Sequence, residues 1–289
     1  MKIAIASGKG GTGKTFISTN ILRSLLLTGQ NALLVDCDAE APDTLGFFRA
    51  EKTKKTIVSQ HVPVIDSRAC TFCGKCHDYC NYNAIFILPH VKIIHVIEDL
   101  CHDCGACSVA CSFDAITEKE VPLGEVTNWE IDNKPVIIEA RTLIGVMSPV
   151  PVIKRAIKEA GDKEAIILFD SPPGTSCPFV QTVVGSDYVI LVTEPTPFGL
   201  SDLKQSIETL QALNKKFGVI INRSDIGNGN LKTYLSDNNF TILLEIPFRK
   251  KIAKMYSEGR IVAETDEVFA NQLLNVIDKI SQEYGDSHN

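Results

Sequence analysis

Short apolar runs alternate with longer segments of helical spacing along most of this chain. Buried strands are predicted at 2–7, 32–36, 165–170, 188–193 and 217–222. Apolar residues recur at helical spacing over 14–28, 150–160, 201–215 and 266–284. Near-continuous apolar strands alternating with helices are typical of a mostly parallel sheet covered by helices on both faces. The pattern therefore predicts an α/β fold.

This alternation is interrupted between about residues 62 and 121. Cys70–Ile85 aligns with Cys101–Ile116 at an offset of 31 residues, and each copy carries four cysteines followed by an Ala-Ile pair. Two half-units this small are best held together by metal. We predict a small α+β domain at 62–121, inserted into a surface loop of a larger domain made of 1–61 and 122–289.

The cysteines of this segment follow the spacing Cys-x2-Cys-x2-Cys-x3-Cys twice. That spacing is typical of two [4Fe–4S] clusters, with the fourth cysteine of each run binding the other cluster. The predicted ligands of the first cluster are Cys70, Cys73, Cys76 and Cys111. Those of the second are Cys101, Cys104, Cys107 and Cys80. Zinc is the alternative, but structural zinc sites favour paired Cys-x2-4-Cys knuckles separated by a long gap.

A glycine-rich segment joins the first predicted strand to the first predicted helix. It reads Gly8-Lys9-Gly10-Gly11-Thr12-Gly13-Lys14-Thr15 and fits the P-loop pattern. Backbone N–H groups of such a loop point at phosphate oxygens, the second lysine bridges the terminal phosphates, and the Thr15 hydroxyl binds Mg²⁺. The alternative is a chance glycine-rich turn, although the flanking strand and helix both favour the P-loop.

Two further segments place aspartates where predicted strands end. Asp36-Cys37-Asp38 ends the second strand, and Asp170 begins Asp-Ser-Pro-Pro-Gly-Thr after another. Such aspartates can be plain helix caps. Their position after a P-loop favours a role at the nucleotide.

Lys9 makes the loop resemble the deviant P-loop of the MinD/ParA/Mrp and nitrogenase-iron-protein class of ATPases. The resemblance implies a homodimer that sandwiches ATP, in which Lys9 reaches the phosphates of the facing subunit. It further implies that Asp38 positions the attacking water and that Asp36 lies near Mg²⁺. Asp170 would hold an Mg²⁺-bound water, and Gly174 would approach the γ-phosphate. A solvated lysine at a variable position is the alternative for Lys9.

The resemblance also assigns roles outside the P-loop. Asn222-Arg223 matches a purine-reading segment, and Pro247-Phe248 is expected to pack on the base. In the nitrogenase iron protein, a cysteine seven residues after the corresponding aspartate binds a cluster that bridges the dimer, and Cys177 has that spacing from Asp170. For both Cys37 and Cys177 the simpler interpretation is buried apolar filler, and the cluster role is a further hypothesis for Cys177 alone.

Composition and charge limit the expected ligands and cellular location of the protein. The formal net charge of −6 argues against nucleic acid as the main ligand. The N-terminus runs directly into the P-loop, and no apolar stretch approaches the ~20 residues of a membrane span. We therefore expect a cytoplasmic protein whose cysteines bind metal. A polar tail at 282–289, and apparent core contacts of Val268, Phe269, Leu273, Leu274 and Ile277, argue against a membrane anchor.

Three functions fit these motifs. The first is an ATPase whose nucleotide-driven dimer gates electron transfer through two clusters to a redox partner, which the sequence does not name. The second is an ATP-dependent carrier that delivers iron–sulfur or another metal cluster to an acceptor protein. The third is a redox-sensing positioning ATPase. No Cys-x-x-Cys follows Cys177, which favours electron transfer over the carrier.

Overall fold

The computed structural model describes residues 1–131, 134–162, 166–227 and 229–285. It divides the chain into two compact units, which are described separately below. Unit 1 comprises Met1–Thr56, Glu125–Arg141 and Ser148–Asn289. Unit 2 comprises Ile57–Gly124 and Thr142–Met147, and the predicted insert at 62–121 lies within its first range.

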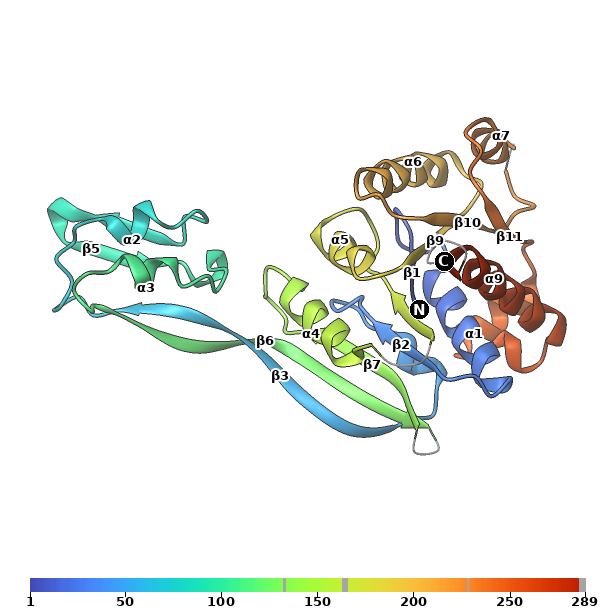
Figure 1. The fold of residues 1–289 in the computed structure, drawn as a ribbon, viewed down its shortest axis with the longest axis horizontal. Coiled ribbons are helices and arrows are strands. Elements are labelled where there is room, and N and C mark those ends of the chain that lie inside the picture. The colour runs from blue at the N-terminus through green and yellow to red at the C-terminus, as the bar shows by residue number, and fades with distance from the viewer. Residues whose placement is uncertain (132–133, 163–165, 228, 286–289) are drawn as a thin grey trace. The chain divides into compact units, whose positions relative to one another are not determined.

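The large sheet has the strand order β11-β10-β9-β1-β8-β2-β7-β6-β3 (Figure 1). Its strands are β1 Lys2–Ala6, β2 Ala32–Asp36, β3 Glu51–Ile65, β6 Ile116–Ile131, β7 Lys134–Thr142, β8 Ile166–Asp170, β9 Tyr188–Thr193, β10 Phe217–Asn222 and β11 Ile242–Ile246. Neighbours from β11 to β7 pair in parallel. The predicted parallel sheet is confirmed, and Ala165, the predicted start of one strand, lies outside the described residues.

The helices of unit 1 are α1 Lys14–Leu27, α4 Val150–Ala160, α5 Cys177–Val184, α6 Pro197–Ala212, α7 Asn230–Asp237, α8 Lys250–Ser257 and α9 Glu267–Gly285, with 3-10 turns η1 Thr44–Phe47 and η4 Val262–Glu264. All four predicted helices are present. Helix α6 starts earlier than predicted because Thr196 caps it, accepting a hydrogen bond from the Gly199 amide, and Pro197 suits its first turn. Residues 286–289 of the predicted polar tail lie outside the described residues.

Helices cover both faces of the sheet, with α1 and α9 on one side and α4 and α5 on the other (Figure 1). Ile3 and Ile5 pack into the α1–α9 layer, where Phe269, Leu273 and Ile277 are buried as predicted. The prediction for Val268 is wrong: this residue, in the first turn of α9, is 71% exposed.

Unit 2 has very little apolar core of its own. It contains α2 Lys75–Asp78, β4 Ile85–Leu88, η2 Pro89–Val91, β5 Ile93–Val96, η3 Glu98–Leu100 and α3 Ala106–Ala110. β4 and β5 form an antiparallel pair. Its buried cluster consists of Cys76, Ile85 and Cys107, flanked by Ile65, Ile94 and Ile116. Two of the three buried side chains of this cluster are therefore thiols.

Within the described ranges, no helix combines the length and apolar character that crossing a membrane requires.

Asn20 connects α1 to the segment before α9. Its side-chain amide donates to the Phe16 carbonyl at 2.7 Å, and its Oδ1 accepts from the Ala263 amide at 2.9 Å. Asn20 is 1% exposed, so Asn20→Ala leaves the Ala263 N–H buried without its partner. We expect a loss of about 1–3 kcal/mol in unfolding free energy, measured by urea denaturation.

Asn238→Ala is the matched control. The Asn238 amide makes the same bond to a carbonyl four residues earlier, at 2.8 Å, but at an exposed position. Its removal should change stability by less than about 0.5 kcal/mol. Equal losses in the two variants would show that the Asn20–Ala263 bond contributes nothing.

Candidate functional site

The P-loop leads directly into the N-terminus of α1, and two of its glycines are required by close contacts. Gly13 has φ 101°, and a Cβ there would lie 2.5 Å from the Asn222 amide nitrogen. A Cβ on Gly8 would lie 2.4 Å from the Asp202 carbonyl oxygen. The loop therefore packs tightly against neighbouring segments while its amide groups stand at a helix N-terminus, where anions are favoured.

Asp36 and Asp170 lie opposite each other in the register of β2 and β8, and both are fully buried. Asp36 accepts hydrogen bonds from the Asp38, Asp43 and Thr44 amides, each at 3.1 Å, and from the Thr44 hydroxyl at 2.8 Å. Burial first, and then the charge of Asp170, raise the pKa of Asp36 well above its usual value. Asp36 thus holds the loop after β2 in place, and its oxygens already have protein donors.

Asp170 faces the P-loop. One of its oxygens accepts a 2.8 Å hydrogen bond from the Thr15 hydroxyl. Burial raises the pKa of Asp170 to about 7, against the lowering effect of Lys14. This places the predicted Mg²⁺ residues Thr15 and Asp170 in direct contact, beside the buried Lys14.

The loop after β2 adds two more carboxylates. Burial raises the pKa of Asp38 to about 6, while the charge of Lys14 lowers it. Burial also raises the pKa of Asp43, against the lowering effects of Thr15 and of the charge of Lys14. The sequence reasoning missed Asp43, although an acid five residues after Asp38 in the same loop was a usable signal.

Two buried oxygens here have no hydrogen-bond partner among the described residues: Asp170 Oδ1 and Thr12 Oγ1. A buried polar atom without a partner is costly unless a ligand satisfies it. An orphaned carboxylate oxygen beside a threonine hydroxyl suits a hard cation such as Mg²⁺, and an orphaned hydroxyl inside a phosphate loop suits a phosphate oxygen. The donor set therefore fits a Mg²⁺–nucleotide.

A cavity of about 290 Å³ opens beside the P-loop. Gly11 and Gly13 border it, and its other walls come from Phe16, Asn222, Arg223, Ile246, Pro247, Phe248, Arg249, Ile252, Ala253 and Tyr256. Asn222 is positioned by a 2.8 Å bond from its amide to the Thr12 carbonyl. The predicted base-reading residues thus meet at one cavity. Phe16 and Tyr256, which also line it, were not predicted, because helical periodicity identifies them only as apolar residues.

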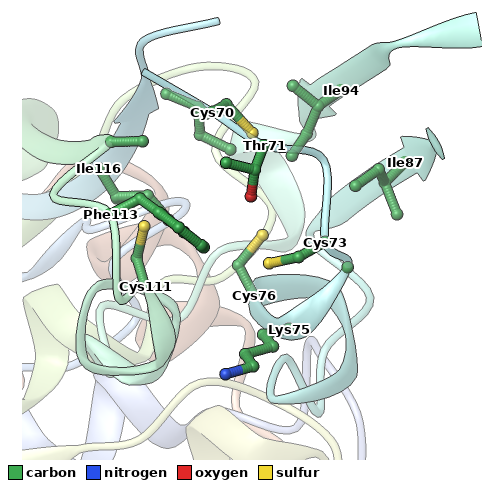
Figure 2. A pocket seen from close by; sticks show the side chains of 13 residues that line it. Cys70, Thr71, Cys73, Lys75, Cys76, Ile87, Ile94, Cys111, Phe113 and Ile116 are labelled. Atoms are coloured by element: carbon green, nitrogen blue, oxygen red, sulfur yellow. The ribbon is translucent and has the colours of Figure 1, made fainter.

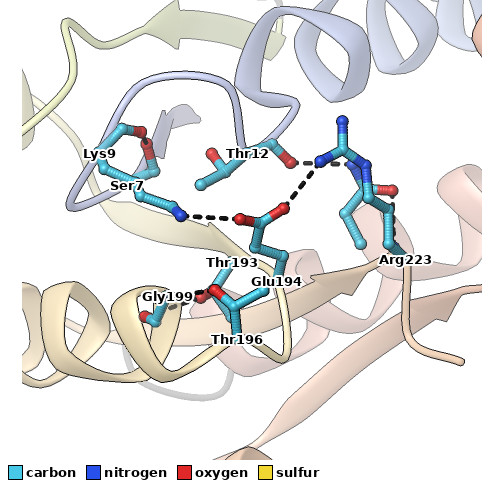
Figure 3. Close-up of polar contacts among 9 residues, drawn as sticks. Ser7, Lys9, Thr12, Thr193, Glu194, Thr196, Gly199 and Arg223 are labelled. Atoms are coloured by element: carbon cyan, nitrogen blue, oxygen red, sulfur yellow. Dashed lines mark hydrogen bonds and ion pairs between the residues drawn. The ribbon is translucent and has the colours of Figure 1, made fainter. Parts of the chain in front are cut away.

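Glu194 is a second residue that sequence reasoning missed. It follows β9 directly, and its two oxygens bind Lys9 Nζ at 2.7 Å and Arg223 Nη1 at 2.8 Å (Figure 3). Lys9, predicted to act at the phosphates of a facing subunit, is thus held by an acid of its own chain. The Gly174 amide, predicted to approach a phosphate, donates to the Ser7 carbonyl at 3.0 Å.

In unit 2 the cysteines gather around two cavities. The first cysteine set, Cys70, Cys73, Cys76 and Cys111, lines one cavity together with mostly apolar side chains. Figure 2 shows its sulfurs turned toward a shared space beside Phe113 and Ile116. The second cysteine set, Cys80, Cys101, Cys104 and Cys107, lines the other cavity with His61, Tyr82 and His102. Each cavity combines three thiols of one run with the last thiol of the other.

The internal repeat is visible in the backbone as well as in the sequence. Left-handed residues occur in pairs at the same 31-residue offset: Phe72 and Asp103, Gly74 and Gly105, Asn83 and Asp114. Burial follows the same pairing, with Cys76 at 8% and Cys107 at 9% exposure. The two halves therefore wrap their cavities with the same loop conformation.

The thiols receive backbone hydrogen bonds. The Phe72 amide donates to Cys70 Sγ and the Ala84 amide to Cys80 Sγ, both at 3.3 Å. Burial raises the pKa of Cys76, Cys101 and Cys107, whereas a backbone bond from Lys75 lowers that of Cys73. Across the described ranges, no three His, Cys, Asp or Glu side chains converge closely enough to hold a single metal ion.

The two remaining cysteines differ. Cys37 is fully buried, and burial raises the pKa of its thiol. Cys177 is exposed at the first residue of α5, so the buried-filler interpretation is wrong for it.

The buried carboxylates make stability depend on pH. The folded state keeps Asp170 protonated to about pH 7, while the unfolded chain releases that proton near pH 4, so the unfolding free energy falls as pH rises between these values. In nucleotide-free protein with EDTA, we expect the melting temperature to fall from pH 5 to pH 8. Asp170→Asn should reduce that slope, and the raised pKa values of Asp36, Asp38 and Asp43 should account for the part that remains.

Asp162→Asn serves as the control for this experiment. The ion pair with Lys2 lowers the pKa of exposed Asp162, so its charge does not change between pH 5 and 8. This variant should keep the slope of the native protein. A slope unchanged by Asp170→Asn would contradict the assignment.

Comparison with known proteins agrees with this geometry. Residues 3–262 match the family model of the CobQ/CobB/MinD/ParA nucleotide-binding domain. An uncharacterised protein of Methanocaldococcus jannaschii is 29% identical over 97% of this chain and 96% of its own length. An iron–sulfur cluster carrier protein of Saccharolobus solfataricus is 22% identical over 96% of this chain and 82% of its own length. A second carrier, from Rickettsia bellii, is 25% identical over 87% of this chain and 62% of its own length.

Among solved structures, the septum site-determining protein MinD of Pyrococcus horikoshii in complex with Mg-ADP superposes with a TM-score of 0.59 at 18% identity, covering 98% of this chain and 97% of its own. MinD of Pyrococcus furiosus gives 0.58 at 20% identity, covering 97% and 98%. These likenesses show the fold. With the family match over most of its length, the chain belongs to the CobQ/CobB/MinD/ParA family of P-loop nucleotide-binding proteins.

Proposed function

We propose that this protein is a Mg²⁺-dependent ATPase whose nucleotide-driven dimer gates electron transfer through two [4Fe–4S] clusters held by unit 2. The observation that carries the proposal is the arrangement of the two cysteine sets. Each set lines its own cavity, and thiols make up most of the buried cluster of the unit. Clusters that complete the core of a unit are resident parts of the protein, which suits electron relay.

The nucleotide half of the proposal uses the P-loop edge of the sheet. Lys14 would contact the terminal phosphates, and Thr15 with Asp170 would hold Mg²⁺, whose chemistry is to neutralise charge on the phosphates. Asp38, with its pKa near 6 and its partial exposure, would orient the attacking water. Asp36 would act near the metal by holding the loop after β2, whose groups donate four hydrogen bonds to it.

In the other half, unit 2 would be an inserted two-cluster ferredoxin domain. Cluster 1 would take Cys70, Cys73, Cys76 and Cys111, and cluster 2 would take Cys101, Cys104, Cys107 and Cys80. Four thiolates complete the ligand set of a cubane, which leaves no iron open to substrate and transfers electrons.

A conformational change at the nucleotide site would be transmitted to the clusters through the sheet. β2, which carries Asp36, pairs with β7, and β6 is the next strand in the sheet. The boundary between the units falls inside β3 and inside β6, so the backbone of both strands continues into unit 2. Within unit 1, Glu159 of α4 binds Lys54 of β3 and accepts a 2.8 Å bond from Asn128 of β6.

A second candidate function is ATP-dependent delivery of iron–sulfur or another metal cluster to an acceptor protein. The observation that favours it is the pair of relatives named iron–sulfur cluster carrier proteins. Exposed Cys177 is the thiol of unit 1 that would bind such a cargo, since Cys37 is buried.

Ligand sharing between the two cysteine runs predicts a specific pattern of iron loss. If Cys76 and Cys111 bind the same cluster, Cys76→Ser/Cys111→Ser should retain about half of the roughly eight irons per chain. Cys107→Ser/Cys111→Ser removes a ligand from each cluster and should lose most of both. Iron and acid-labile sulfide are counted after anaerobic reconstitution.

The reverse ranking of these double variants would show that each run binds its own cluster and would contradict the shared sets. Cys177→Ser and Cys37→Ser are the matched controls and should keep full iron content. Loss of iron in Cys177→Ser alone would instead assign that thiol to a cluster or cargo.

The main test separates redox gating from delivery. The reconstituted protein is titrated potentiometrically with and without Mg²⁺–ATP, and in parallel its iron is assayed in a cluster-free acceptor ferredoxin. We expect a nucleotide-dependent shift of at least about 30 mV in one cluster potential, which a difference of ~0.7 kcal/mol produces for a one-electron couple. Lys14→Ala should abolish the shift.

Transfer of iron to the acceptor with no shift of potential would overturn redox gating in favour of the carrier. Glu159→Gln tests the path through the sheet, because it removes the charge that binds Lys54. This variant should keep ATP hydrolysis and reduce the shift.

A further inference from the structure

Lys9, Glu194 and Arg223 form a continuous ionic connection from the P-loop to the base cavity. Each oxygen of Glu194 binds a different cation, Lys9 at 2.7 Å and Arg223 at 2.8 Å (Figure 3). The Glu194 side chain is 12% exposed, so its carboxylate is largely shielded from water, while the side chains of Lys9 and Arg223 are 30% and 44% exposed. Arg223 also lines the base cavity, and Lys9 belongs to the phosphate loop.

The surrounding bonds fix all three residues in place. The Ser7 hydroxyl donates to the Lys9 carbonyl at 2.6 Å, and the Arg223 amide donates to Asn222 Oδ1 at 3.0 Å. Glu194 stands between β9 and the Thr196 cap of α6. The Lys9 ammonium therefore has a defined partner in its own chain.

We propose that Glu194 is a positioning residue that restrains Lys9 within its own subunit until nucleotide occupies the site. This inference rests on the proposed ATP-dependent dimer, in which Lys9 serves the facing subunit. Lys9 cannot bind Glu194 and phosphates of another chain at once, so dimerisation must break this pair. The base and sugar of a nucleotide beside Arg223, and its phosphates beside the P-loop, compete with Glu194 for the same two cations.

The restraint reduces the fraction of molecules whose Lys9 is free to act in a dimer. The apparent affinity of one subunit for another falls in proportion to that fraction. Neutralising Glu194 should therefore strengthen dimerisation. A merely structural Glu194, which holds the P-loop together, predicts the opposite: its removal would weaken nucleotide binding and dimerisation alike.

The first measurement concerns the nucleotide-free protein and does not depend on dimerisation. Lys9 is labelled with an amine-acylating reagent at pH 8, and its modification rate is measured by mass spectrometry. Glu194→Gln should raise the rate at Lys9 about 3- to 10-fold, because the amine loses its ion pair. Glu264→Gln, which breaks the comparable ion pair with Arg23, should leave the Lys9 rate unchanged.

The second measurement is sedimentation of the reconstituted full chain with Mg²⁺ and a non-hydrolysable ATP analogue. Glu194→Gln should reach half-maximal dimer at about 3- to 10-fold lower analogue concentration than the native protein. Because the effect passes through Lys9, the double variant Lys9→Ala/Glu194→Gln should match Lys9→Ala alone.

An unchanged Lys9 rate in Glu194→Gln, or a dimer weaker than that of the native protein, would overturn the restraint. A native protein that stays monomeric with the analogue would instead contradict the proposed dimer. In that event the labelling result still decides whether Glu194 restrains Lys9.

Discussion

The structure of the nucleotide site depends on two carboxylates that are buried side by side. Asp36 and Asp170 end adjacent parallel strands, in register and without solvent exposure. Bringing like charges together in a low-dielectric interior is unfavourable unless donors, cations or protons compensate. Asp36 is compensated by the loop after β2, whose amides and hydroxyl bind it. Asp170 is compensated by Thr15 and Lys14 and keeps one oxygen without a partner in the described part of the chain. The hydrogen bonds that shape the loop after β2 and the unpaired oxygen that could bind a metal thus have the same cause. Both follow from burying two carboxylates next to each other.

Unit 2 is limited by a different factor, which is its small number of buried apolar side chains. Its buried cluster is too small to offset the conformational entropy of more than sixty ordered residues. Two of the three buried side chains in this cluster are thiols, so metal–sulfur bonds would add to the small apolar core. The repeated left-handed residues show how the halves do this: each turns its loop so that three sulfurs face inward, and the fourth sulfur comes from the other half. Sharing of ligands would make neither half stable alone.

Local patterns in the sequence predicted the features that depend on nearby residues. Apolar periodicity gave the parallel sheet and its flanking helices, and the cysteine spacing gave both sets of thiols that line the cavities. The long strands β3 and β6 were missed because their sequences are polar and charged, as in 51–56, and lack the apolar run that marks the central strands. Glu194 was missed because its role depends on Lys9 and Arg223, which are distant in sequence. Val268 and Cys177 were misjudged because an apolar residue type does not say which face of a helix is covered.

The charge balance around the P-loop links nucleotide to cation. Carboxylates from Asp36, Asp38, Asp43, Asp170 and Glu194 outnumber the cations of Lys9, Lys14 and Arg223 around this loop. Raised pKa values at Asp38 and Asp170 mean that the empty site takes up protons where a divalent cation would otherwise neutralise it. A nucleotide that brings its own Mg²⁺ would replace those protons, and its phosphates would be anionic partners for Lys9. In the proposed dimer, the Mg²⁺–nucleotide complex would therefore compete with Glu194 for Lys9.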